Sequence, residues 1–202
     1  MMIEKWRRAL AEDISLHNIE MSEMALTSSV QKIIDRLLFL RICEDKEIEP
    51  YKQLYNIAKQ KDNIYIALKT LFANANVRFN AGLFARDEFL DFLNVQDKTL
   101  IAIINELYYP SCQYEFSVLP VEILGSIYER FLGKVIRFKR KTKNGHSVEI
   151  VEKPEVQKAG GVYYTPSYIV SYIVEQTIGK KVAGASPEKV ANLKICDPSC
   201  GS

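Results

Sequence analysis

Apolar residues recur at helical spacing through the first two thirds of the chain. The strongest stripe runs from Val30 to Ile42, and either Ser22 or Thr27 could begin this helix. Further helical stripes lie at about 3–19, 54–58, 64–72, 89–93, 100–107 and 121–132. Pro110 ends one stripe, and Pro120 suits the first turn of the next. The pattern predicts a mainly α domain.

The spacing changes after Gly133. Two strand-like runs, 135–140 and 148–152, flank Asn144-Gly145, which predicts a protruding β-hairpin. A helix is expected from about 167 to 178, and the apolar run 193–196 reads as a strand. The predicted fold is therefore mainly α with a β-hairpin, followed by the first helix and strand of an α/β domain.

Composition narrows the function classes only slightly. The 202 residues carry a net charge of +2, too small by itself to indicate a nucleic-acid partner. No run of 18 apolar residues predicts a membrane-spanning helix, so we expect no membrane partner. The four cysteines form no Cys-x-x-Cys pair, which favours reduced thiols, a cytoplasmic protein and no metal site.

Two short motifs carry the most chemistry. The first is Tyr163-Tyr164-Thr165-Pro166, and the second begins at Asp197-Pro198 and continues through Cys200 and Gly201. An acidic residue after a strand, followed by small residues, is typical of a doubly wound α/β domain that binds a nucleotide-like ligand. Each motif alone has a plainer interpretation: Thr165 and Pro166 as helix N-cap and first residue, or Asp197-Pro198 as a strand exit.

Together the motifs resemble the start of a DNA adenine-N6 methyltransferase domain, in which the two stretches hold S-adenosylmethionine. Upstream, the segments 35–45 and 124–133 resemble the helical region of type IIG restriction–modification enzymes. Those enzymes join a nuclease, a helical connector, a methyltransferase and a target-recognition domain in one chain. The resemblance covers roughly residues 6–202 and implies double-stranded DNA as a partner.

The resemblance assigns roles to individual residues. Asp197 would counter the positive methionine end of the cofactor, and Gly201 would let the backbone approach it closely. Thr165, at a helix start, would favour the cofactor carboxylate, while the two tyrosines would pack near the ligand. The cofactor-binding residues expected on this basis are Tyr163, Tyr164, Thr165, Pro166, Asp197, Pro198, Cys200 and Gly201.

The sequence also departs from the family pattern. The catalytic Asn/Asp-Pro-Pro-Tyr/Phe motif, the acidic residue for the cofactor ribose and the last glycine of the Asp197 motif are not in it. We therefore expect a fragment of a longer enzyme, without catalytic residues and inactive alone, that serves as a connector within the rest of the parent chain. The expected domains are 1–133 (helical connector), 134–158 (hairpin) and 159–202 (truncated methyltransferase start). The alternative is a stand-alone helical module that binds protein or DNA.

Two sets of charged residues could add a DNA contact or a nuclease site to this function. The basic hairpin residues Arg137, Lys139, Arg140 and Lys141 could contact DNA phosphates, or could simply pair with the acidic return strand. Asp35 and Glu44 are the best candidates for a nuclease metal site. Nine helical residues place them on opposite faces and about 13 Å apart along the axis, so solvated or interhelical ion pairs are the better interpretation. Mg²⁺ would be required only if a nuclease precedes this segment.

Overall fold

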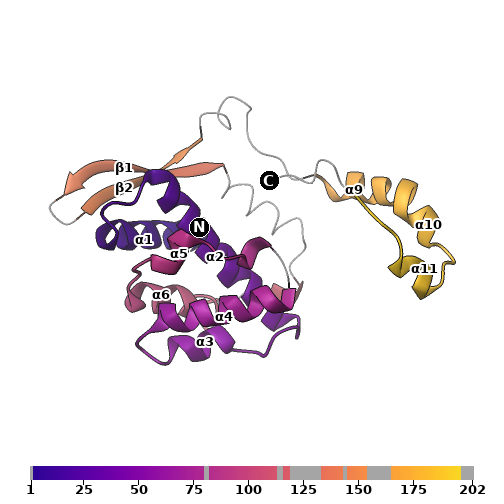
Figure 1. Cartoon of the computed structure of the whole chain (residues 1–202), viewed down its shortest axis with the longest axis horizontal. Coiled ribbons are helices and arrows are strands. Elements are labelled where there is room, and N and C mark those ends of the chain that lie inside the picture. The colour runs from indigo at the N-terminus through magenta and orange to yellow at the C-terminus, as the bar shows by residue number, and fades with distance from the viewer. Residues whose placement is uncertain are drawn as a thin grey trace. The chain divides into compact units, whose positions relative to one another are not determined.

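The computed structural model describes residues 2–79, 82–112, 116–118, 133–142, 145–153 and 165–196, with side chains left out of the description at 140–142 and 145. The chain divides into two compact units, Met1–Val162 and Tyr163–Ser202. Among the described residues the first unit contains a helical core with a β-hairpin, and the second contains short helices (Figure 1). The mainly α prediction is confirmed.

The helical stripes of the sequence correspond closely to the helices of the first unit. The α-helices are α1 (Met2–His17), α2 (Glu23–Asp45), α3 (Gln53–Ala58), α4 (Ile64–Phe79), α5 (Glu88–Phe92) and α6 (Asp97–Asn105). Two short 3₁₀ turns, η1 (Gly82–Phe84) and η2 (Phe116–Val118), complete the described helical part. The helix expected at 121–132 lies outside the described residues.

Helix α2 forms the centre of this unit. Its apolar residues occupy most of its circumference, and those from Val30 to Leu40 that face the core are almost completely buried. A helix that is apolar on most sides must be covered on most sides, and α2 is contacted by α1, α3, α5, η1, η2 and the hairpin. Of the two candidate starts, the structure selects Ser22, whose hydroxyl accepts a hydrogen bond from the Ala25 amide at 3.2 Å.

The predicted hairpin forms from β1 (Lys134–Thr142) and β2 (Gly145–Glu152), which pair antiparallel. Ile136 lies opposite Ile150, and Phe138 lies opposite Val148. These four side chains face the helices: Ile136 is fully buried and the others are packed against the core. The expectation that the hairpin protrudes is therefore wrong for this part, because one apolar face of the ribbon is covered by α1 and α2 (Figure 1).

Polar contacts from the helices also satisfy the free edge of β1. The Ile136 amide donates to the Thr27 hydroxyl at 3.0 Å, and the Phe138 amide donates to the Glu23 carboxylate at 2.6 Å. An edge strand otherwise leaves such amides unpaired. The first turns of α2 thus act as a substitute for a third strand.

The second unit contains α9 (Ser167–Val174), a π-helical turn η3 (Glu175–Gly179), α10 (Lys180–Val182) and α11 (Pro187–Ala191). The helical run therefore extends past the predicted end at 178, and Gly184 follows it with a φ of 71°. The strand predicted at 193–196 is wrong: these residues form no strand. A strand needs a hydrogen-bonded neighbour, and in the described part of the chain the only sheet is the β1–β2 hairpin.

Candidate functional site

The expected cofactor residues fall mainly outside the described part of the chain. Tyr163, Tyr164, Asp197, Pro198, Cys200 and Gly201 lie outside it, whereas Thr165 and Pro166 are described and exposed. The two motifs belong to the same compact unit. Their joint role in binding a cofactor stays a prediction.

Thr165 and Pro166 lead directly into α9. Pro166 is the N-cap residue, and its carbonyl accepts hydrogen bonds from the Ile169 and Val170 amides at 2.9 and 3.2 Å. The interpretation of Thr165 as N-cap and Pro166 as first helical residue is therefore wrong by one position, because the helix begins at Ser167. The Thr165 hydroxyl still lies at the positive end of the helix, where an anionic group such as a carboxylate is favoured.

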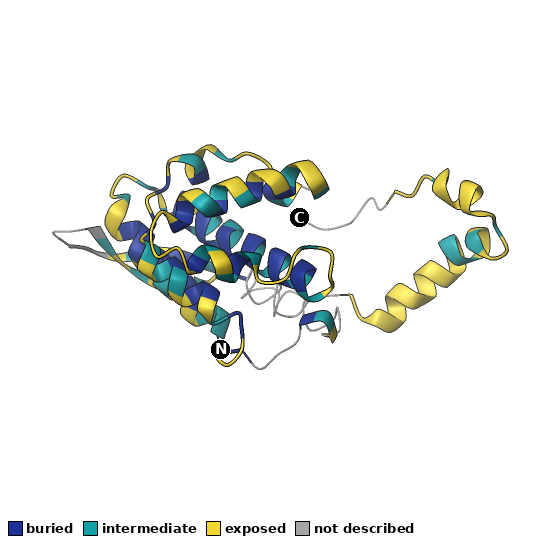
Figure 2. Ribbon diagram, turned by 90° about the horizontal axis from the view of Figure 1, so that it is seen from below, coloured by how far each residue is buried: buried dark blue, intermediate teal, exposed yellow. Residues whose placement is uncertain are grey.

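Helix α9 is unusually apolar for a helix with no buried residue. Every described residue from 165 to 196 is exposed or only partly buried (Figure 2). The exposed large apolar side chains of α9 are Tyr168, Ile169, Val170, Tyr172, Ile173 and Val174. An apolar surface of this kind marks a face that another structural layer normally covers.

The basic hairpin residues are largely matched by acidic neighbours. Arg137 donates to Glu23 at 2.8 Å, and this hydrogen bond, together with that from the Phe138 amide, holds the pKa of Glu23 below its usual value. Lys139 lies 3.9 Å from Glu149 on the return strand. The side chains of Arg140 and Lys141 lie outside the described part. DNA contact by these four residues stays a prediction, with two of the charges already paired within the unit.

The acidic residues considered for a nuclease site are held apart by structural contacts. Asp35 accepts a hydrogen bond from Gln31 at 3.4 Å, and burial raises the pKa of the Asp35 carboxyl to about 6. Glu44 and Asp45 instead pair with Arg41, at i,i+3 and i,i+4. An ion pair is therefore present for Glu44, but it lies within α2, and the expected solvation is wrong because Glu44 is buried. In the described part of the chain, no three His, Cys, Asp or Glu side chains gather as a metal site.

Glu44 organises the buried network next to α3. One carboxylate oxygen accepts the Lys52 amide at 3.1 Å and the Tyr108 hydroxyl at 2.6 Å, and the other accepts the Leu54 amide at 3.1 Å. Burial and the adjacent Glu44 carboxylate raise the pKa of Tyr108. Glu44 thus caps α3 from α2, a role that linear spacing did not reveal.

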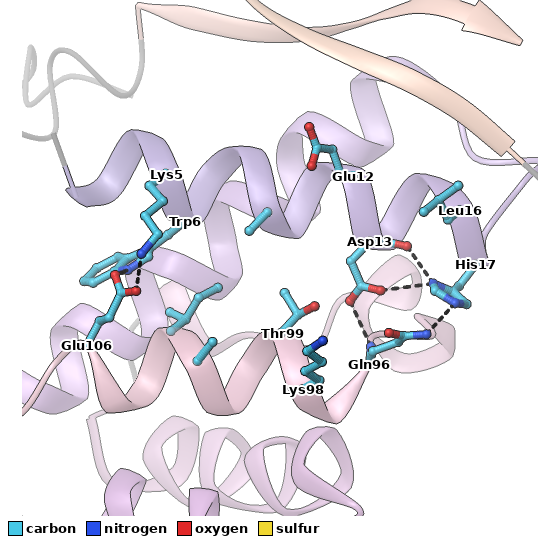
Figure 3. Close-up of a pocket in the computed structure, with 13 residues that line it drawn as sticks. Lys5, Trp6, Glu12, Asp13, Leu16, His17, Gln96, Lys98, Thr99 and Glu106 are labelled. Atoms are coloured by element: carbon cyan, nitrogen blue, oxygen red, sulfur yellow. Dashed lines mark hydrogen bonds and ion pairs between the residues drawn. The ribbon is translucent and has the colours of Figure 1, made fainter. Parts of the chain in front are cut away.

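A groove of about 610 Å³ lies between α1 and α6 (Figure 3). At one end, Asp13 accepts the Gln96 amide at 2.9 Å and lies 3.1 Å from His17, whose other ring nitrogen is 2.9 Å from the Gln96 side chain. At the other end, Glu106 accepts hydrogen bonds from Lys5 and from Trp6. Partial burial alone would raise the pKa of Glu106, but these two donors lower it below its usual value. The polar groups at both ends join the two helices.

The sequence was compared with proteins of known function. The chain is 34% identical over 200 residues, or 99% of its length, to the Type II restriction enzyme and methyltransferase RM.Eco57I of Escherichia coli. The chain resembles part of a restriction enzyme and methyltransferase. This match confirms the resemblance drawn from the two motifs and the upstream helical segments.

The match covers nearly all of this chain but only 19% of the relative. Since the aligned segment includes 99% of the chain, the similarity extends through both compact units. No family model matches the chain, and no solved structure matches it. None of the described helices has the length and apolar character needed to cross a membrane.

Proposed function

We propose that this chain is the connector and the beginning of the methyltransferase domain of a DNA restriction–modification enzyme. The intact protein would transfer the methyl group of S-adenosylmethionine to the N6 atom of adenine in a specific sequence of double-stranded DNA. The observation that carries the proposal is the 34% identity over 99% of the chain to a restriction enzyme and methyltransferase. Both proposed cofactor motifs lie within a match of this extent.

The exposed face of α9 supports this proposal. In a doubly wound domain, helices pack their apolar sides onto a central sheet. Helix α9 presents Ile169, Val170, Ile173 and Val174 without a buried contact among the described residues. In the intact enzyme we assign the cover of this face to the sheet of the methyltransferase domain.

The roles within the cofactor site follow from chemistry. S-adenosylmethionine supplies an activated methyl group on a positively charged sulfur. Asp197 would attract the positively charged methionine end, and Thr165 would contribute its hydroxyl and the nearby positive end of α9 to the cofactor carboxylate. Tyr163 and Tyr164 would provide flat apolar surfaces for packing. We assign no catalytic residue to these 202 positions and expect them to transfer no methyl group alone.

Calorimetry with S-adenosylmethionine tests the proposal. The protein to be titrated contains this chain together with the sequence that follows it in its gene. We expect binding in the extended protein, at least tenfold weaker binding after Asp197→Ala, and none by the 202 residues alone. Glu188→Ala, at an exposed residue of α11, serves as the control and should bind normally. Absence of binding in a folded extended protein would instead favour a helical interaction module.

A further inference from the structure

The surface around α3 brings three lysines and two tyrosines together. Its members are Tyr51, Lys52, Tyr55 and Lys59, with Lys61 two residues further along, and we call this group the α3 face. All three lysines are exposed, and Tyr51 retains 59% of its accessible surface. No acidic residue occurs between positions 50 and 61. Glu49 precedes this stretch and Asp62 directly follows Lys61, so carboxylates flank the face at both ends but do not interrupt it.

Several other cations of this unit form ion pairs within it. Lys5, Lys32, Lys134 and Arg137 each pair with a carboxylate. In contrast, none of the lysines of the α3 face makes an ion pair in the part of the chain that the structure describes. The nearest acidic residue before the face, Glu49, is already paired with Arg78 at 3.1 Å.

Aromatic rings fix the position of this positive surface. The Lys52 ammonium lies 5.2 Å from the centre of the Tyr51 ring, and the Lys59 ammonium lies 4.7 Å from that of Tyr55. Both tyrosine rings pack against Tyr108, at 6.5 and 5.4 Å between centroids. Lys52 and Lys59 therefore lie over tyrosine rings that pack against the buried Tyr108. This combination of positive charge and aromatic surface is suited to a nucleic-acid backbone.

The buried Glu44 network fixes the backbone of the same surface. Lys52 has a φ of 68°, and its amide donates to Glu44 at 3.1 Å. The guanidinium of the buried Arg41 lies 5.7 Å from the centre of the Tyr51 ring. Because these contacts hold the face in one conformation, less conformational entropy is lost when a ligand binds it.

We propose that the α3 face contacts the phosphate backbone of double-stranded DNA. The inference rests on the proposed function for its choice of duplex DNA as the polyanion. The lysines would pair with phosphates, and the tyrosine hydroxyls can donate hydrogen bonds to phosphate oxygens. The contact carries no base specificity and positions the helical unit on DNA. In Figure 1, α3 lies on the side of this unit away from the hairpin, so the two basic surfaces can be tested separately.

The test measures DNA binding of the 202-residue chain by fluorescence anisotropy, using a labelled duplex of arbitrary sequence across about 50 to 200 mM salt. The triple variant Lys52→Gln, Lys59→Gln, Lys61→Gln should bind roughly tenfold or more weakly at low salt and lower the salt slope by about 3. Lys59→Gln alone should lower the slope by about 1. Circular dichroism and thermal unfolding verify that each variant is folded.

The matched control is Lys98→Gln, at an exposed lysine of α6 outside both basic surfaces, which should keep the salt slope of the unchanged chain. The hairpin variant Arg137→Gln, Lys139→Gln tests the second basic surface separately. The proposal is overturned if the unchanged chain does not bind the duplex, if the triple variant keeps its slope, or if only the hairpin variant loses affinity. Calorimetry of the extended protein separates this result from the proposed function. The triple variant should bind S-adenosylmethionine normally, and failure of cofactor binding with an altered DNA slope would remove the proposed function alone.

Discussion

Glu44 shows how one buried carboxylate can join three elements. It lies on α2, accepts two amides at the start of α3 and accepts the hydroxyl of Tyr108, while it is only 2% exposed. A carboxylate in such a position is stable because each neighbouring donor is also satisfied. Its acidic side chain is therefore explained by packing and needs no metal.

Glu44→Ala should destabilise the chain by roughly 3 kcal/mol, because it leaves buried donors unsatisfied. Tyr108→Phe removes a single hydroxyl and should cost about 1 kcal/mol. The exposed Glu20→Ala should change the free energy of unfolding by less than about 0.5 kcal/mol. Urea unfolding measures all three, and a Glu44→Ala variant as stable as Glu20→Ala would refute the capping role.

Asp35 is a second carboxyl on α2, and its environment disfavours the charged form. Burial raises its pKa to about 6 from an ordinary value of 3.8. The folded chain binds a proton here more readily than the unfolded chain, so this group lowers stability as the pH rises from about 4 to 6. Asp35→Asn should therefore raise the free energy of unfolding by roughly 1–3 kcal/mol at pH 7.5.

The pH dependence provides the control for Asp35. Near pH 4 the carboxyl is protonated in the folded chain, and the advantage of Asp35→Asn should largely vanish. Urea unfolding at both pH values measures the difference. An equal effect of the substitution at pH 4 and pH 7.5 would show that the charge of Asp35 is not its cause.

Among the contacts between elements, those from side chains of α2 satisfy the outer edge of the hairpin. Thr27→Val removes the hydroxyl that accepts the Ile136 amide while preserving shape and helix propensity. We expect a loss of about 1–2 kcal/mol and faster hydrogen exchange at the Ile136 amide. The control is Thr70→Val, at an exposed residue whose hydroxyl donates to the Ile66 carbonyl of its own helix, and it should be nearly neutral. Unchanged exchange at Ile136 would contradict the edge contact.

Periodicity predicted most of the described helices and the hairpin because both depend on patterns within a few residues. The stripe from Val30 to Ile42 needed no knowledge of its neighbours. In contrast, the docking of β1 on Thr27 and Glu23 joins residues more than 100 positions apart. The strand expected at 193–196 required a partner strand, which local sequence cannot supply. The local pattern was thus enough to predict helices and strands, whereas long-range polar contacts determine how these elements pack together.

Less of the candidate site than of the helical fold could be predicted from the sequence. The two cofactor motifs could be recognised only as a pair, and most of their residues lie outside the described part of the chain. The separation of Asp35 from Glu44 followed from helical spacing, but the contacts of Glu44 with α3 did not. The α3 face was also missed, although Tyr51 and Tyr55 are four residues apart, because the contacts of its lysines with these rings, and of the rings with Tyr108, depend on the fold.

Helix α9 yields a prediction that concerns the extended enzyme. Its apolar residues are exposed here, and the proposal assigns their cover to the methyltransferase sheet. Amides of α9 should therefore exchange much more slowly in the extended protein than in the 202-residue chain. Ile173→Ser should weaken this protection only in the extended protein. Equal exchange in both proteins would mean that no sheet covers α9.

The whole chain consists of two compact units, to which we assign different roles. The unit Met1–Val162 contains the described helical core and the hairpin, and the range Tyr163–Ser202 includes both motifs proposed to bind the cofactor. The chain matches 19% of a restriction enzyme and methyltransferase, so the activity proposed belongs to the intact protein. The proposals assign positioning on DNA to the first unit and the start of the cofactor site to the second.

An assay of methyl transfer tests the proposal that the intact protein is a DNA adenine methyltransferase. The extended protein is incubated with tritiated S-adenosylmethionine and duplex DNA, and the labelled nucleoside is identified after digestion. The account predicts label on N6-methyladenine, little label after Asp197→Ala, and none from the 202 residues alone. An extended protein that is folded and binds DNA but transfers no methyl group to adenine would contradict the account.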